Sequence, residues 1–193
     1  MKKFLFLSVA ILTVSALFSQ QSAKLPEGYG NAKWGTSMDA VKSAIIGKLV
    51  YTDDEKVMIS KDDNLEYTYG FFYADPQKIP AADTNTNTNN TQTTDGILFY
   101  VSVKFPYLPV DQVRTKFEAQ YGAITIDNVY KNKGAIGWQG DKTLTLICVD
   151  EYEKKQYVAR VTYVSTDIIK QVNDYEISVF NKPEIETIRK LNP

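Results

Sequence analysis

Alternation of apolar and polar side chains is the feature that most constrains the fold of this chain. In LEYTYGFFY, residues 65–73, an apolar or aromatic residue occupies every odd position. The stretches ILFYVSVKF (97–105) and YVARVTY (157–163) carry matching odd-numbered rows. A period of two is that of a β-strand with one face buried. The pattern therefore predicts an antiparallel sheet whose strands each turn one apolar row toward a core.

Three segments have helical spacing instead. They are 36–46, which opens with a capping-box spacing, 109–120, which has Pro109 in its first turn, and 166–180. A short helical tail after Pro183 is a further option. The predicted strands are 49–52, 56–61, 65–73, 97–105, 124–130, 135–139, 143–149 and 157–164, with Asp, Asn and Gly at the turns between them.

The two halves of the chain share one order of elements, a helix followed by about four strands. MDAVK (38–42) and VDQVR (110–114) open corresponding helices. We therefore expect two half-repeats, at about 34–105 and 107–164, within a single domain that covers 21–193. The expected fold class is α+β, an antiparallel sheet built from two helix-plus-strands repeats with the helices on one face.

The first twenty residues predict export. Lys2 and Lys3 precede a stretch without charge from Phe4 to Phe18, the pattern of a secretory signal peptide, and this stretch is shorter than the about 20 residues of a membrane span. An uncleaved anchor is the alternative. The only cysteine, Cys148, lies far from the expected cleavage point, so no lipid anchor is predicted. We expect a soluble periplasmic or extracellular protein, with no membrane span after signal removal.

Residues 81–95, AADTNTNTNNTQTTD, contain no large apolar side chain. Such a segment buries too little surface to offset the entropy of ordering, so a mobile loop is predicted. A tolerated insertion is one interpretation, and a loop that orders on a partner is the other.

Composition excludes most catalytic chemistry. The chain has no histidine and one cysteine, which removes Ser-His and Cys-His nucleophiles and zinc sites built from Cys and His. Alternation predicts that Cys148 is a buried apolar residue. Removal of residues 1–20 leaves 20 basic and 23 acidic residues, a balance that does not attract nucleic acid. We predict no catalytic residues, no bound cofactor and no metal.

Carboxylates gather at 53–55, 62–63 and 150–153. These positions fall at predicted hairpin turns, where Asp and Asn are favoured for local backbone reasons, so solvated turns are the main interpretation. A weak calcium site and a carboxylate-dependent hydrolase are the alternatives.

WGTSMDAVKSAIIG (34–47) resembles the Trp-Gly-x-Ser-x-x-x-Val opening of small exported bacterial domains. The duplicated helix-and-strands order is also similar to that of the beta-lactamase inhibitor protein family and of the small lipoprotein of the outer-membrane assembly machine. This resemblance implies a protein-binding or envelope-structural role and no catalysis.

Aromatic residues are the remaining candidates for recognition. The odd-numbered row at 65–73 is expected in the core, and Phe72, Tyr100 and Trp138 are the possible partner contacts. Trp138 has a second interpretation, in which it packs a helix against the sheet. The expected function is a non-enzymatic envelope protein that binds another envelope or extracellular protein. The alternative is a small-ligand or carbohydrate binder that uses an aromatic sheet face.

Overall fold

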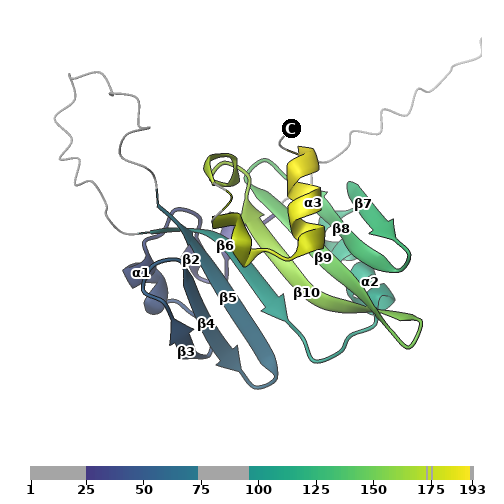
Figure 1. Cartoon of the computed structure of the whole chain (residues 1–193), viewed down its shortest axis with the longest axis horizontal. Helices are drawn as coiled ribbons and strands as arrows, with labels where there is room; N and C mark the ends of the chain where they lie inside the picture. The colour runs from purple at the N-terminus through teal and green to yellow at the C-terminus, as the bar shows by residue number, and fades with distance from the viewer. Residues whose placement is uncertain (1–24, 74–95, 173, 175, 192–193) are drawn as a thin grey trace, which may run out of the picture.

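The computed structural model describes residues 25–73, 96–172, 174 and 176–191. This part of the chain holds an eight-stranded antiparallel sheet, a two-stranded sheet, three α-helices and two 3-10 helices (Figure 1). The α+β class is therefore as predicted. The predicted signal peptide (1–20) and the predicted loop (81–95) lie outside the described residues.

The strands of the large sheet match the alternating segments to within a few residues. Its order is β3-β4-β5-β6-β10-β9-β8-β7. Their bounds are β3 (Lys48–Thr52), β4 (Val57–Asp62), β5 (Leu65–Phe72), β6 (Ile97–Lys104), β7 (Ile126–Tyr130), β8 (Lys133–Gln139), β9 (Thr143–Tyr152) and β10 (Lys155–Ser165). The small sheet is formed by β1 (Gly28–Tyr29) and β2 (Ala32–Lys33).

One helix precedes each half of the large sheet in the chain. Helix α1 (Met38–Lys42) precedes β3 to β6, and helix α2 (Val110–Tyr121) precedes β7 to β10. The last strands of the two halves pair in the middle of the sheet, where Ser102 lies opposite Thr162. Among the described strands of this sheet, β6 and β10 are the one neighbouring pair that is not consecutive in the chain.

Helices α1 and α2 cover one face of the sheet, called here the back face. The predicted odd-numbered row lies on it: Tyr67, Tyr69 and Phe71 are buried with Met38 and Val41 of α1. Helix α2 packs its apolar side chains on the back face of β8, β9 and β10. The prediction that the row at 65–73 belongs to the core is confirmed.

Helix α1 is shorter than the predicted segment 36–46. The side chains of two sheet residues hold the chain after it: the Tyr69 hydroxyl accepts from the Ile46 backbone N–H at 3.1 Å, and the Ser60 hydroxyl donates to the Ile46 carbonyl at 2.6 Å. These hydrogen bonds attach residue 46 to β4 and β5, so the backbone leaves the helical path.

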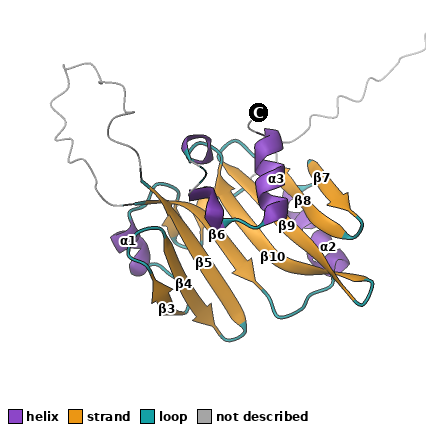
Figure 2. Cartoon of the chain, viewed as in Figure 1, coloured by secondary structure: helices purple, strands orange, loops and turns teal. Residues whose placement is uncertain are grey.

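The opposite, front face carries the C-terminal part of the chain. It consists of the 3-10 helices η1 (Ile169–Gln171) and η2 (Glu176–Val179) and of helix α3 (Lys182–Leu191). Figure 2 shows α3 in front of the sheet, with α1 and α2 behind it. The prediction that the helices lie on one face is therefore wrong.

The predicted helix 166–180 is also wrong over its described residues. The β-branched residues Ile168, Ile169 and Val172 lose side-chain freedom in a helix, and only one 3-10 turn forms among them. The helix forms at the optional position after Asn181 instead. There the Asn181 side chain accepts from the Glu184 N–H at 3.1 Å, and the Glu184 carboxylate accepts from the Asn181 N–H at 2.8 Å. This reciprocal capping fixes the start of α3.

Trp34 ties the N-terminal segment to the second half of the sheet. Its indole N–H donates to the Thr143 hydroxyl at 2.8 Å, and that hydroxyl donates to the Pro26 carbonyl. We expect Trp34→Phe to lower the free energy of unfolding by about 1 kcal/mol, because the ring is kept and one hydrogen bond is lost. Urea denaturation of the two proteins measures this. An unchanged midpoint would contradict the role given to the indole N–H.

Candidate functional site

The front face of β3, β4 and the first part of β5 is the centre of the candidate site, because no helix among the described residues lies over it. Figure 1 shows β3, β4 and β5 open toward the viewer, whereas α3 lies over the second half. The exposure of the side chains agrees: Tyr51 on β3 is 52% exposed, and Ile59 and Thr68 are partly exposed. An open sheet face with exposed aromatic, aliphatic and hydroxyl side chains is available for contact with a partner.

The strand register places charged side chains in one line across this face. Residues directly opposite each other in an antiparallel sheet project from the same side. Successive opposite pairs connect Lys48 of β3, Lys61 of β4, Glu66 of β5, Lys104 of β6 and Arg160 of β10. These five residues are called the charged row. Four of them are cations and one is an anion, so the line is positive overall.

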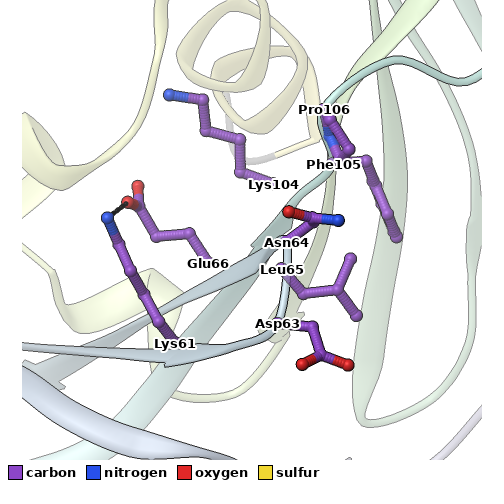
Figure 3. A pocket seen from close by; sticks show the side chains of 8 residues that line it. All are labelled: Lys61, Asp63, Asn64, Leu65, Glu66, Lys104, Phe105 and Pro106. Atoms are coloured by element: carbon purple, nitrogen blue, oxygen red, sulfur yellow. Dashed lines mark ion pairs between the residues drawn. The ribbon is translucent and has the colours of Figure 1, made fainter.

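Figure 3 shows the middle of the charged row from close by. The Lys61 Nζ lies 3.2 Å from a Glu66 carboxylate oxygen, and Lys104 lies on the same side of the sheet. Asp63, in the β4–β5 turn, points away from these three side chains. A shallow hollow of about 280 Å³ adjoins them, and Phe105 and Pro106 form part of its wall.

A neutral row lies beside the charged row. It connects Tyr51, Ile59, Thr68 and Ser102 through the same register. Exposure falls along it from 52% at Tyr51 to 3% at Ser102, where the C-terminal segment begins to cover the sheet. The face thus offers an apolar and hydroxyl-bearing strip next to a charged one, the mixture found in protein interfaces.

At its covered end the charged row meets α3. The Glu184 carboxylate accepts hydrogen bonds from the Thr162 hydroxyl and from the Cys148 thiol, the latter at 3.4 Å. Burial raises the pKa of Glu184, and the positive charge of Arg160 opposes this rise. Burial and the charge of Glu184 likewise raise the pKa of Tyr100. An acidic side chain of the chain itself is therefore seated beside the basic end of the row.

Cys148 lies in this buried group. Burial, the charge of Glu184 and the hydrogen bond to it hold the pKa of the thiol well above its ordinary value. The thiolate, which is the nucleophilic form, is disfavoured in such a setting. The prediction that Cys148 is a buried core residue is confirmed.

Two of the turn carboxylates, those of Asp53 and Asp150, have partners within the chain. One Asp53 oxygen accepts from the N–H groups of Glu55, Lys56 and Val57 at 2.8–3.1 Å. Burial raises the pKa of Asp53, but these donors lower it more, and it ends below its ordinary value. The Lys133 ammonium lies 2.8 Å from Asp150 and holds the pKa of that carboxyl low. Within the described ranges, no group of three or more His, Cys, Asp or Glu side chains is placed to hold a metal ion.

A larger hollow of about 610 Å³ lies between the start of α3 and the second half of the sheet. Tyr130, which is 74% exposed, lines it together with Asn128 and the Lys133–Asp150 pair. The Lys190 ammonium donates to the Asn128 side chain at 2.6 Å. Some of the polar groups beside this hollow are thus already hydrogen-bonded or ion-paired with one another.

The three residues proposed as partner contacts are all buried. Phe72 and Tyr100 do lie on the front face, but they are 5% and 0% exposed, because Phe180 and the other apolar side chains of the C-terminal segment pack over them. Trp138 is 0% exposed on the back face, where it packs against α2. Burial removes all three from the surface, so the expectation that they contact a partner needs correction. The second interpretation of Trp138 is confirmed.

The charged row had no signal in the linear sequence. Its members come from five strands, and nothing in their spacing distinguishes them from ordinary surface charges. Only the register of the strands brings them into line, and the register between β6 and β10 depends on the assembly of both halves.

We expect Lys61→Glu combined with Lys104→Glu to lower the free energy of unfolding by no more than about 1 kcal/mol. Both side chains are exposed, and the Lys61–Glu66 pair is solvated, so little stability depends on them. Urea denaturation checks this. A larger loss would show that these lysines hold the sheet together.

The site thus belongs to an α+β protein with an eight-stranded antiparallel sheet that is open on the front of its first half. A scan against protein-family models, a search of curated proteins and a search of solved structures each found no match to this chain. Of the helices in the described ranges, none has the length and apolar character needed to cross a membrane.

Proposed function

We propose that this protein is an exported, non-enzymatic component of the bacterial envelope that binds another protein through the front face of β3 to β6. The observation that carries the proposal is this open face, where the neutral and charged rows lie side by side. Export rests on the charged and apolar pattern of residues 1–20.

The residues available for chemistry support a binding role. The whole chain lacks histidine, and its one cysteine is a buried thiol with a raised pKa. Of the turn carboxylates, Asp53 is engaged by backbone N–H groups and Asp150 by lysine. A shallow, mixed polar and apolar face suits another macromolecular surface better than a small molecule, which is bound in a deep cleft.

We further propose that the two halves arose by duplication of one helix-plus-four-strands unit. The support is their common element order and the pairing of their last strands at the centre of the sheet. Such an origin accounts for a sheet of eight strands with one covering helix for each half.

The binding proposal is tested by photo-crosslinking in the producing cell. A benzophenone amino acid placed at Ile59 or Thr68 reports contacts of the front face, and one placed at Gln112 or Lys116, on the exposed side of α2, is the matched control. We expect a discrete adduct of higher mass from the front-face positions alone. If irradiation gave no adduct from these positions, or the same adducts from α2, the proposal would be abandoned.

A second candidate function is the binding of a small polar ligand, such as a carbohydrate, in the 610 Å³ hollow. Tyr130 favours it, since an exposed aromatic ring beside amide and carboxylate groups suits sugar binding. A glycan array with the wild-type protein and with Tyr130→Ala tests it. Glycan binding that Tyr130→Ala abolishes would support this function, and an array without binding would remove it.

A further inference from the structure

We propose that the partner presents carboxylate groups to Lys48, Lys61 and Lys104, so that an acidic polypeptide surface docks on the charged row. This inference rests on the proposed function, because it specifies the chemistry of the protein that the front face binds. Three observations carry it: the positive excess of the row, the position of Glu184 of α3 beside one end of it, and the position of Glu66.

The positive excess is available to a partner. Neither Lys48 nor Lys104 has an ion-pairing carboxylate within 4.0 Å among the described residues. Lys61 has Glu66, and this pair is open to solvent on the lysine side, where the side chain is 54% exposed. A partner carboxylate therefore meets cations without first breaking a buried pair, so the cost of desolvation is small.

The chain's own C-terminal helix places an acidic residue beside the covered end of this row. Glu184 of α3 accepts hydrogen bonds from Thr162 and from Cys148, the residue opposite Arg160, and the charges of Glu184 and Arg160 shift each other's pKa. Helix α3 packs on β8 and β9, next to the Arg160 end of the row, and Lys48, Lys61 and Lys104 toward the other end are exposed. The exposed part of the row has three lysines and one glutamate in register across neighbouring strands.

The position of Glu66 favours a folded protein over a uniform polyanion. Its carboxylate lies between Lys61 and Lys104 in the row, so a single negative charge interrupts the line of cations. A phosphate or uronate polymer, which carries like charges at every unit, is repelled at this point. A protein surface can place carboxylates opposite the lysines and a donor opposite Glu66, and it can cover Tyr51 and Ile59 at the same time.

The test combines charge reversal with the front-face photo-crosslink at Ile59, in the full-length protein. The double variant Lys61→Glu, Lys104→Glu is compared with Lys116→Glu, Lys155→Glu, which makes the same change in net charge at exposed positions on α2 and at the start of β10. We expect the yield of the Ile59 adduct to fall at least about tenfold in the first variant and to stay at the wild-type level in the second. Equal yields in the two variants would overturn the acidic-partner inference while leaving the binding function in place.

Carbodiimide coupling identifies the partner groups directly, because it joins an amine to a carboxylate within contact distance. It is applied to the intact complex in Glu66→Gln protein, which lacks the internal carboxylate that competes for Lys61. We expect mass spectrometry to find Asp or Glu of a second polypeptide joined to Lys48, Lys61 or Lys104. An adduct at Ile59 that resists protease digestion would indicate a glycan and overturn the inference. The complete absence of an Ile59 adduct would count against the proposed function itself.

Discussion

Replacing Trp138 with alanine should lower the free energy of unfolding by about 3–5 kcal/mol, the range for removal of a large buried aromatic side chain. Trp138 is fully buried. The centroid of its ring lies 5.6 Å from the ring centroid of Phe117 and 6.1 Å from that of Tyr121. Its indole N–H donates to the Gly122 carbonyl at 2.8 Å, just after α2 ends. Loss of this side chain removes the anchor of α2 on β8. Equilibrium urea denaturation, followed by circular dichroism, measures the effect.

Two further variants separate packing from hydrogen bonding at this position. Trp138→Phe keeps a ring and leaves the Gly122 carbonyl without its donor, so we expect a smaller loss of about 1–3 kcal/mol. Tyr130→Ala removes an aromatic ring that is 74% exposed and should change stability by about 0.5 kcal/mol or less. If Trp138→Ala proved no more destabilising than Tyr130→Ala, the anchoring of α2 by Trp138 would be refuted.

Glu184→Gln should make the protein more stable at neutral pH and should flatten the dependence of its stability on pH. Burial raises the pKa of Glu184 in the folded protein, so the protonated form is favoured there. The stability that the folded protein has with Glu184 protonated is fully present below the ordinary pKa of 4.5. It is lost as the pH rises through the raised pKa of the folded state. Each unit by which the pKa is raised corresponds to about 1.4 kcal/mol. Glutamine keeps the capping geometry and cannot ionise.

Urea denaturation of both proteins between about pH 4.5 and neutral pH measures this difference. Asp53 and Asp150 do not confuse the result, because their pKa values are lowered and the stability that they contribute is lost only as the pH falls below their ordinary value of 3.8. Arg160→Met is the companion variant. Because the charge of Arg160 lowers the pKa of Glu184, its removal should extend the loss of stability to higher pH. An unchanged pH dependence in Glu184→Gln would contradict the role of this carboxyl.

Local patterns predicted the parts of the fold that depend on short-range chemistry. The alternating row of Tyr67, Tyr69 and Phe71 is a core row, since one residue of offset moves a side chain to the other face of a strand. The predicted helix 109–120 corresponds closely to α2, where Val110 and Val113 repeat at helical spacing toward the sheet. In both β5 and α2, the apolar residues that recur at the period of the strand or helix are the residues on the buried face.

The C-terminal part could not be predicted in the same way, because its position depends on contacts between distant segments. Phe72 and Tyr100 lie on the side of the sheet opposite the core row, yet Phe180 and its neighbours bury them. No local feature of β5 or β6 indicates that the end of the chain returns across the sheet. The charged row escaped prediction for a related reason, since it exists only in the register of assembled strands.

The pairing of β6 with β10 has a consequence for folding kinetics. Every other neighbouring pair of strands in the large sheet is consecutive in the described chain, whereas Lys104 and Arg160 meet across the whole of α2 and β7 to β9. The pairing of the two halves therefore carries a loop-closure cost that the hairpins within each half do not. Each half has hairpins and a helix that can form through nearby contacts. Cooperative stability of the whole sheet depends on the pairing of β6 with β10, which joins the two halves.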